Sequence, residues 1–515
     1  MITDHVDDFT FDFSDEGDGP NNGDGELRKL LLDMAEDTDR RLVKLSETID
    51  PAIRGIKPER VSRFAPQGGL MPFNPTDMGN AKRFAALYRG KVRYCHTWKK
   101  WLIYSGGRWA KDETGEIIRL AKSTVESIYG EARMIPEEVE RKAVAKHAIH
   151  SESDKRIQSM IRLAESEEGI PVLPSELDRD VHKLNCLNGT IDLRQAKLLP
   201  HNPADLITRQ APVSYDEEAV APRWKQFLNE IFMNRPDLTD FMHRYLGYCC
   251  TGETREQVFV IGYGGGANGK STLLDTVLEV LGDYATSTPF STFTLRRRES
   301  VRNDLADISS ARLVTASEAG EGMPFDEELV KRLTGDGSMK ARFLFSEFFS
   351  FAPRFKLFLA TNHKPRIKGT DLAIWRRVRL VPFEAVYEGE NRDQKLKEKL
   401  LAEAPGILTW LVIGAMLWQD MGLGNPEEVR EATEQYRAGE DTLGCFLNEC
   451  CEKGDGLRQP ARVLYHAYRD YSGGRAISEK AFAEKMEQRG FEKKKTSTGA
   501  FYLGISLLPG IRDDG

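Results

Sequence analysis

A glycine-rich segment near the middle of the chain carries the pattern of a phosphate-binding loop. Residues 264–271 read GGGANGKS and satisfy G-x-x-x-x-G-K-[ST]. Glycines let the backbone wrap around phosphate oxygens, the lysine neutralises the β- and γ-phosphates, and the hydroxyl ligates Mg²⁺. We therefore expect a site for ATP and Mg²⁺. The residues expected to hold the nucleotide are Gly264, Gly265, Gly266, Ala267, Asn268, Gly269, Lys270, Ser271 and Thr272.

The segments on either side of this loop are the elements that would position it. Residues 258–262, VFVIG, form an apolar and β-branched run that is typical of a buried strand. Apolar residues then recur at helical spacing from Leu273 to Leu281, and Gly282 is a suitable residue to end that helix. Strand, loop and helix thus occur in the order that the motif requires, which disfavours a chance glycine-rich turn.

Two further apolar runs end in polar side chains that would complete a hydrolytic site. Residues 312–317 predict a strand followed by Glu318, a carboxylate that would hold Mg²⁺ together with Ser271 and polarise the attacking water. Residues 355–361 predict another strand, followed by Asn362, whose amide would orient that water or contact the γ-phosphate. For both residues the alternative is a local role at a strand end.

An arginine-rich segment, WRRVR at residues 375–379, comes after these strands. An arginine supplied to the γ-phosphate of a neighbouring subunit stabilises transition-state charge and is worth about 10³–10⁵ in rate. Arg376 or Arg377 fits that role, and a structural ion pair is the alternative. The residues expected to act in catalysis are Lys270, Glu318, Asn362, Arg376 and Arg377.

Composition bounds the class of protein. The chain has 515 residues with a formal net charge of −7, and 40% of its residues are hydrophobic, which is typical of a soluble protein of about three domains. Its seven cysteines have neither C-x-x-C nor zinc-finger spacing, so we expect reduced thiols. The chain starts without a signal peptide, and its longest apolar run, residues 407–418, is too short to span a membrane. We expect a cytoplasmic protein without a membrane partner.

Shifts in composition divide the chain into five parts. Residues 1–75 are expected to be an acidic disordered tail, a short helix and a linker, and residues 76–215 are expected to form an α+β accessory domain with a hairpin at 98–109. Residues 216–385 are expected to form an α/β P-loop ATPase core. Residues 386–440 are expected to be a helical extension, and residues 441–515 are expected to contain three helices and a hairpin. The last pattern is typical of a winged helix, with Lys493, Lys494 and Lys495 near its wing. These lysines would bind DNA, and protein contacts are the alternative.

The motifs, in this order, resemble those of the superfamily 3 DNA helicases, specifically the helicase half of the phage/plasmid and poxvirus-type primase-helicase family. The matching segments are GGGANGKST, ARLVTASEAGEGMPFDEELVKRLTGDGSMKARF, FKLFLATNHKP and WRRVRLVPF. Upstream, residues 77–84 and the segment LNCLNGTIDL resemble the accessory domain that precedes the motor in this family. The resemblance extends from about residue 77 to the C-terminus.

The resemblance implies an AAA+-like ATPase core. It implies a homo-hexameric ring that hydrolyses ATP between subunits and translocates on single-stranded or forked DNA during replication of a phage or mobile element. In this family a hairpin between the second and third motifs projects into the ring channel. Lys340 and Arg342 are therefore the first candidates for DNA contact, in a stretch to Leu380 that holds ten basic and two acidic residues and is interleaved with phenylalanines. For the phenylalanines themselves, a place in the core is the favoured interpretation.

This sequence departs from the family pattern at two places. Many relatives carry two adjacent acids at the second motif, whereas here Ser317 precedes a single Glu318. Relatives often have Gly-Gly-Asp where this chain has Gly-Asp-Gly at residues 335–337. With a single acid at the second motif, Glu318 would both hold the metal ion and polarise the attacking water.

Three hypotheses on function differ in the process for which the chain would use ATP. About 75 residues precede the accessory region, so we expect a helicase without its own priming activity, served by a separate primase or polymerase. An ATP-switched origin- or promoter-binding regulator without unwinding activity is the second hypothesis. A small-molecule or nucleoside kinase is the third, disfavoured by the basic stretch and by the segments around Asn362 and Arg376.

Overall fold

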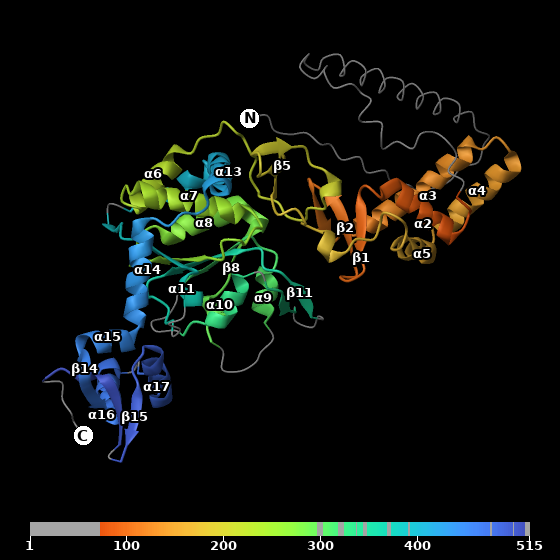
Figure 1. Ribbon diagram of the computed structural model, residues 1–515. Helices are drawn as coiled ribbons and strands as arrows, with labels where there is room; N and C mark the ends of the chain where they lie inside the picture. The colour runs from red at the N-terminus through yellow and green to blue at the C-terminus, as the bar shows by residue number, and fades with distance from the viewer. Residues whose placement is uncertain are drawn as a thin grey trace, which may run out of the picture. The chain divides into compact units, whose positions relative to one another are not determined.

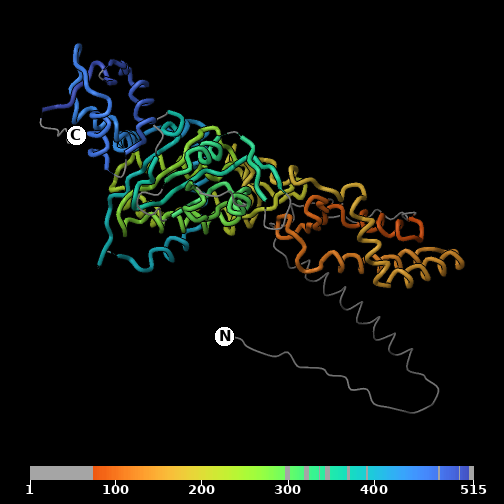
Figure 2. The backbone as a smooth tube through the Cα atoms, turned by 90° about the horizontal axis from the view of Figure 1, so that it is seen from below, coloured from red at the N-terminus to blue at the C-terminus, as the bar shows by residue number. Residues whose placement is uncertain are grey.

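The computed structural model describes residues 73–509 except 296–301, 318–323, 336, 343–347, 368–371, 390–391, 474–475 and 498, and the excepted residues are grey in Figures 1 and 2. The predicted acidic tail and helix before residue 73 lie outside the described residues. The same holds for Glu318, the predicted metal ligand, and for Asp336, which lies in one of the two segments that depart from the family pattern.

The first described region is an α+β domain. It contains α2 (Asp77–Tyr88), β1 (Val92–Cys95), β2 (Lys100–Ser105), β3 (Arg108–Lys111), α3 (Glu116–Met134), α4 (Glu138–Ser151) and α5 (Asp154–Ala164). The hairpin predicted at residues 98–109 is confirmed, because β2 and β3 pair antiparallel around Gly106 and Gly107, which have φ angles of +57° and +82°. One face of the β1–β2–β3 sheet packs on α2, α3 and α5.

A second antiparallel sheet follows, made of β4 (Lys183–Cys186), β5 (Gly189–Asp192) and β6 (Lys197–Leu199). A turn over residues 193–196 joins β5 to β6, and β4 precedes them. Strand β4 is short and mixes lysine and asparagine with two apolar residues, so its own pattern is weak, and pairing with β5 makes it a strand.

The predicted α/β core is confirmed as a central parallel sheet. Its strands are β7 (Phe259–Tyr263), β8 (Ala285–Ser287), β9 (Leu313–Ser317), β12 (Lys356–Thr361) and β13 (Val378–Pro382), in the order β13-β7-β12-β9-β8. Along β7, Phe259 and Ile261 enter one hydrophobic cluster and Val260 enters another. Both faces of the sheet are therefore covered, as the continuous apolar runs of a parallel sheet require.

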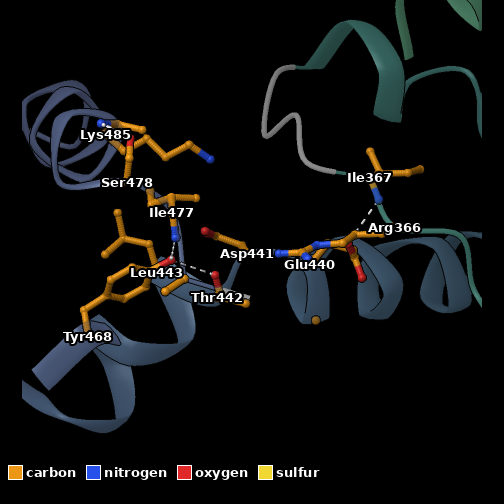
Figure 3. A pocket seen from close by; sticks show the side chains of 13 residues that line it. Arg366, Ile367, Glu440, Asp441, Thr442, Leu443, Tyr468, Ile477, Ser478 and Lys485 are labelled. Atoms are coloured by element: carbon orange, nitrogen blue, oxygen red, sulfur yellow. Dashed lines mark hydrogen bonds between the residues drawn. The ribbon is translucent and has the colours of Figure 1, made fainter. Parts of the chain in front are cut away.

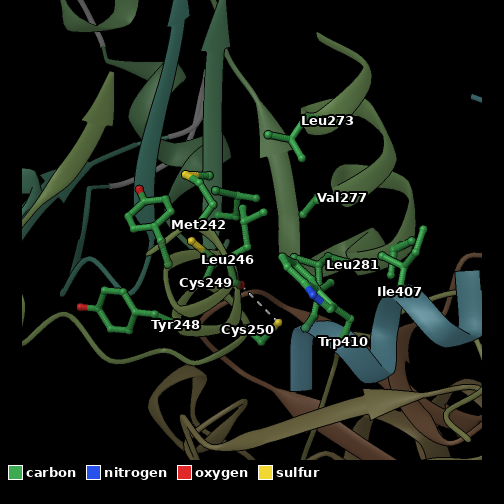
Figure 4. Close-up of a cluster of buried hydrophobic side chains, with 14 of the residues drawn as sticks. Met242, Leu246, Tyr248, Cys249, Cys250, Leu273, Val277, Leu281, Ile407 and Trp410 are labelled. Carbon is green, nitrogen blue, oxygen red and sulfur yellow. Dashed lines mark hydrogen bonds between the residues drawn. The ribbon is translucent and has the colours of Figure 1, made fainter. Parts of the chain in front are cut away.

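Helices cover the two faces separately (Figure 1). One face is packed by α6 (Pro222–Ile231), α7 (Pro236–Cys250), α8 (Lys270–Leu281) and α13 (Ala404–Met421). The other is packed by α9 (Asn303–Ile308), α10 (Glu327–Leu333) and α11 (Leu372–Trp375). Figure 4 shows how Leu246 of α7, Val277 of α8 and Trp410 of α13 meet in the first of these clusters.

The core continues across the predicted boundary at residue 386. Helix α13 packs against α7, where the rings of His243 and Trp410 stack with centroids 4.0 Å apart. A Cβ atom on Gly247 would lie 2.1 Å from the backbone nitrogen of Ala415, so the two helix backbones touch. The helical extension predicted for residues 386–440 is wrong at its start, because among the described residues helix begins only at α12 (Leu396–Leu401). The charged segment before α12 has no apolar face to pack.

The C-terminal region contains α14 (Glu427–Glu440), α15 (Thr442–Glu449), β14 (Cys451–Pro460), α16 (Ala461–Ser472), α17 (Glu479–Gln488), β15 (Lys493–Thr496) and β16 (Gly499–Leu507). The three predicted helices and the β15–β16 hairpin are present after α14. Strand β14 was not predicted, because its polar, glycine-containing sequence has no apolar alternation. It becomes a strand by pairing with β16 in the sheet β14-β16-β15.

The junction between α14 and α15 is fixed by Asp441. Its carboxylate accepts a hydrogen bond from the backbone nitrogen of Gly444, which caps α15, and forms an ion pair with Arg489 at 2.6 Å. A cavity of about 430 Å³ lies beside this junction, between Ile367 and the start of α17 (Figure 3). Within the described residues, no helix is long and apolar enough to cross a membrane.

Candidate functional site

The predicted phosphate-binding loop lies at the carboxyl edge of the parallel sheet. Strand β7 is flanked by β13 and β12, whereas β8, the next strand of this sheet along the chain, lies at the far edge. In α/β sheets, ligands bind in crevices outside the carboxyl ends of the strands, at the point where the order of the strands reverses. The loop leaves β7 at this point and leads into α8, whose first residue is Lys270.

Close packing explains two of the loop glycines. A Cβ atom on Gly264 would lie 2.0 Å from the carbonyl oxygen of Phe383, and one on Gly269 would lie 2.4 Å from Cγ2 of Ile231. Gly269 also has a φ angle of +86°, in the left-handed region that favours glycine. Larger residues at these positions would therefore push the loop away from the strand and helix that support it.

Lys270 is held at the centre of the site. Its side chain is 5% exposed, and its ammonium group donates hydrogen bonds to the carbonyl oxygens of Gly264 at 2.8 Å and Gly265 at 3.0 Å. It also donates to Oδ1 of Asn268 at 3.0 Å and to Oδ1 of Asn362 at 3.2 Å. The contact with Asn362 brings together two residues that are 92 positions apart in sequence and were both predicted to act in catalysis.

The side chain of Asn268 braces the loop from inside. It is 4% exposed, and its Nδ2 atom donates to the carbonyl oxygens of Gly265 at 2.6 Å and Phe383 at 3.2 Å. The backbone nitrogen of Tyr387 donates to the carbonyl oxygen of Ala267 at 2.7 Å. The segment after β13 thus supports the phosphate-binding loop, a role for Phe383 and Tyr387 that no pattern in the sequence indicated.

Burial lowers the pKa of Lys270 to about 8. We therefore expect the affinity for an ATP analogue to fall as the pH rises from 7.5 to 9.5. The ammonium group loses its proton in this range, and the neutral amine no longer attracts phosphate, whereas the phosphate groups are already ionised. Titration calorimetry at several pH values measures this change. Lys270→Arg keeps its charge and is expected to bind with little pH dependence, so equal pH profiles for both proteins would contradict the prediction.

The Mg²⁺ site is described only in part. Ser271 is exposed at the start of α8, where its hydroxyl oxygen is a suitable ligand for Mg²⁺, and Thr272 follows it in the first turn. Glu318 comes directly after Ser317, the last residue of β9, and lies outside the described residues. Strand β9 pairs with β12, which ends beside Asn362. The roles of Ser271 and Glu318 as metal ligands stay predictions.

The two candidate arginines lie at the opposite edge of the sheet from Lys270 of the same chain. Both come directly before β13, which runs parallel to β7 with Val378 opposite Phe259. Five residues at about 3.3 Å each separate Arg377 from the carboxyl edge, or about 16 Å. Neither arginine can therefore reach the phosphate-binding loop of its own chain without a large rearrangement.

Arg376 and Arg377 differ in exposure. Arg377 is 8% exposed, and its guanidinium donates a hydrogen bond to the carbonyl oxygen of Ala373 at 2.6 Å. Arg376 is exposed, and its guanidinium donates to Oε1 of Gln257 at 3.0 Å. Of these two arginines, Arg376 is therefore the one that a neighbouring molecule can contact.

The basic stretch from residue 340 to 380 is not one continuous surface. Lys356 is 2% exposed and donates to the carbonyl oxygens of Thr251 and Glu253, just beyond the end of α7. Burial lowers its pKa to about 7. Arg354 donates to the carbonyl oxygen of Asp178. The charge of this stretch is therefore not all available to DNA, because Lys356 is buried and the guanidinium of the half-buried Arg354 binds a backbone carbonyl.

The first candidates for DNA contact lie on a hairpin. Strands β10 (Met339–Ala341) and β11 (Phe349–Phe351) pair antiparallel, and the residues between 342 and 348 lie outside the description. Lys340 is exposed, and the guanidinium of Arg342 lies 4.7 Å from the ring centroid of Phe348. The predicted core role of the phenylalanines is confirmed for Phe349 and Phe351, which pack against a buried cluster, and is wrong for Phe348, which is 64% exposed.

The C-terminal candidates lie on a strand edge. Lys493, Lys494 and Lys495 form most of β15 and are all exposed, and the ammonium group of Lys493 lies 5.6 Å from the ring centroid of Tyr502. They lie far along the chain from the loop at 264–269, and their binding of DNA stays a prediction.

Two family descriptions match different parts of the chain. Residues 81–233 match the family described as "D5 N terminal like", and residues 262–377 match a family of unknown function, DUF5906. The first match covers the α+β region with α6, and the second runs from the end of β7 to the arginine pair. Accessory region and phosphate-binding loop thus match in the order that the sequence predicted.

Several viral proteins are similar to this chain. A protein of Acanthamoeba polyphaga mimivirus named "Putative helicase" is 26% identical over 57% of this chain and 33% of its own length. A "Putative helicase" of Invertebrate iridescent virus 6 is 24% identical over 61% and 36%, and a "Putative primase" of African swine fever virus is 25% identical over 53% and 31%. The chain spans about a third of the length of these curated relatives.

Among solved structures, the C-terminal region of NrS-1 is similar, with a TM-score of 0.45 and 12% identity over 81% of this chain and 96% of that one.

Proposed function

We propose that this chain, a relative of the D5-like viral primase-helicases, is an ATP-dependent DNA helicase of the superfamily 3 type that acts in DNA replication. Its substrates are ATP with Mg²⁺ and single-stranded or forked DNA. The observation that carries the proposal is the contact of Lys270 with Asn362 at the carboxyl edge of the sheet. It brings a phosphate-binding lysine and an amide that can sense the γ-phosphate or orient water to one point, which is the requirement for nucleotide hydrolysis.

The placement of the arginines supports a site shared between subunits. Arg376 is exposed at the edge of the sheet opposite its own phosphate-binding loop. A head-to-tail ring, proposed as a homo-hexamer, would bring this edge of one AAA+-like core against the carboxyl edge of the next. ATP bound by Lys270 of one subunit would then receive the Arg376 side chain of its neighbour.

Two exposed basic elements support the choice of DNA as the partner. The β10–β11 hairpin presents Lys340 and Arg342 beside an exposed phenylalanine, a combination that binds phosphates and stacks on bases. The C-terminal elements α15, α16 and α17 with the sheet β14-β16-β15 would form a winged-helix domain, with β15 and its three lysines as the wing. A primase or polymerase of the replisome would be a further partner.

Displacement of a labelled strand from a forked duplex tests the proposal. We expect the purified chain to release the strand only with ATP and Mg²⁺, and to release little with a non-hydrolysable analogue. Lys340→Ala with Arg342→Ala is expected to lower DNA-stimulated ATP hydrolysis about tenfold and leave basal hydrolysis unchanged, because these residues lie away from the loop.

Two results would redirect the proposal. ATP hydrolysis stimulated by DNA without any displacement, on forks of either polarity, would favour the ATP-switched regulator. Transfer of phosphate to a nucleoside or sugar would favour a kinase. Sedimentation with ATP and single-stranded DNA measures the number of subunits in the assembly. A strict monomer would contradict the ring, since it cannot supply an arginine to a neighbour.

A further inference from the structure

The turn between β1 and β2 presents a tryptophan to solvent. Cys95 pairs with Lys100, which leaves residues 96–99 as the turn, and Lys99 adopts a left-handed φ of +52°. Trp98 is 39% exposed, whereas Trp101 and Trp109 of the same sheet are 9% and 1% exposed. The turn therefore holds a large aromatic ring out of the core that its neighbours form.

The sequence around this turn is strongly basic. Residues 78–111 contain nine lysines and arginines and no aspartate or glutamate. Three of the cations are paired: Arg83 with Glu131, Lys91 with Glu116 and Arg108 with Asp283.

Three exposed lysines meet at the turn. Lys99 is in it, Lys100 follows it, and Lys111 of β3 places its ammonium group 5.5 Å from the ring centroid of Trp98. In the part of the chain that the structure describes, none of the three forms an ion pair. The carboxylate of Asp112, next to Lys111, accepts hydrogen bonds from the backbone nitrogens of Thr114, Glu116 and Ile117 and is thus committed to the start of α3.

We infer that Trp98, Lys99, Lys100 and Lys111 form a binding site for single-stranded DNA on the accessory domain. The exposed ring offers a face on which a base can stack, and three lysines around it supply attraction for the flanking phosphates. This inference rests on the proposed function for the identity of the nucleic acid. It adds a contact outside the ATPase core, so DNA would be held before or after it passes the β10–β11 hairpin.

Photo-crosslinking of the full chain locates the contact directly. An oligonucleotide containing 5-iododeoxyuridine is bound to the chain in the absence of ATP and irradiated. The crosslinked peptides are then identified by mass spectrometry. We expect a crosslink at Trp98, which Trp98→Ala removes. In anisotropy titrations with labelled oligo(dT), Trp98→Ala is expected to bind about tenfold more weakly and Trp98→Phe to bind nearly as tightly as the parent chain.

The salt dependence of DNA binding tests the lysines, and two exposed lysines elsewhere in the accessory domain provide a matched control. Lys99→Ala with Lys100→Ala is expected to reduce the slope of log affinity against log salt by about 1.4, or about 0.7 for each phosphate contact on a single strand. Lys122→Ala with Lys146→Ala removes two exposed lysines from α3 and α4 and is expected to leave the slope unchanged. All four positions are on the surface, and thermal melting checks that the variants fold.

The outcomes separate this inference from the proposed function. If the parent chain binds DNA but crosslinks only elsewhere, and Trp98→Ala binds normally, the inference is overturned and the helicase proposal stands. If the parent chain binds no single-stranded DNA under any condition, both fail. Tighter binding of an RNA of the same length, lost in Trp98→Ala, would overturn the assignment to DNA.

Discussion

Replacing Lys270 by alanine is expected to lower ATP hydrolysis by about 10²–10³-fold and to abolish strand displacement. The ammonium group is the buried cation at the carboxyl edge of β7, and it already lies within 3.2 Å of four oxygen atoms of the loop and of Asn362. Phosphate oxygens would replace some of these acceptors when ATP binds. Without the cation, charge on the transferring phosphoryl group is not neutralised. Steady-state phosphate release with and without single-stranded DNA measures the loss.

A control lysine separates this effect from a general loss of charge. Lys225 is exposed on α6 and lies outside the loop, and Lys225→Ala is expected to hydrolyse ATP at the parent rate. Asn362→Ala is expected to keep ATP binding and lose turnover, because in the proposed site its amide would act on the γ-phosphate or the water rather than on the whole nucleotide. Normal turnover by Lys270→Ala would refute the assignment of the nucleotide site.

Arg376→Ala is expected to lose about 10³-fold or more of the ATP turnover while it still binds ATP and keeps its melting temperature. The side chain is exposed and lies at the edge of the sheet opposite its own loop, so its removal disturbs neither the core nor the chain's own phosphate contacts. Arg377→Ala is expected to behave differently and to unfold at a lower temperature. Its guanidinium is buried and donates to the carbonyl oxygen of Ala373, and truncation removes this hydrogen bond together with the packing of the buried side chain.

Mixing two inactive variants tests whether Arg376 acts on a neighbour. In randomly mixed rings of Lys270→Ala and Arg376→Ala subunits, about a quarter of the interfaces join an intact lysine to an intact arginine. We expect the equimolar mixture to regain a measurable fraction of the ATP turnover that each variant alone lacks. No recovery, in rings shown by sedimentation to contain both variants, would place the arginine outside the shared site.

Local patterns predicted the elements that carry the nucleotide site. The strand at β7, the loop and the helix α8 follow from a β-branched apolar run, a glycine-rich motif and helical periodicity, all of which are short-range signals. Strand β14 was missed because its polar sequence has no such signal and depends on its partner β16. Phe383 and Tyr387 were missed for a similar reason, since their contacts with the loop come from the place of β13 in the sheet.

The charge of a residue did not predict its surroundings. Lys356 and Arg354 belong to the basic stretch by composition, yet Lys356 is buried and both side chains donate to backbone carbonyl oxygens. Lys340, in the same stretch, is exposed on a hairpin. A linear count of lysines and arginines contains no information on burial, which depends on what packs against each side chain.

The sequence by itself determined that this chain has a glycine-rich loop between a buried strand and a helix, because the residue types and spacing of that motif are local. The tertiary structure decided which distant residues meet there. It set Asn362 beside Lys270 through the pairing of β7 with β12, and it buried Arg377 while leaving Arg376 exposed. Strand order and burial arise from long-range packing, so adjacent residues of one type can have different roles.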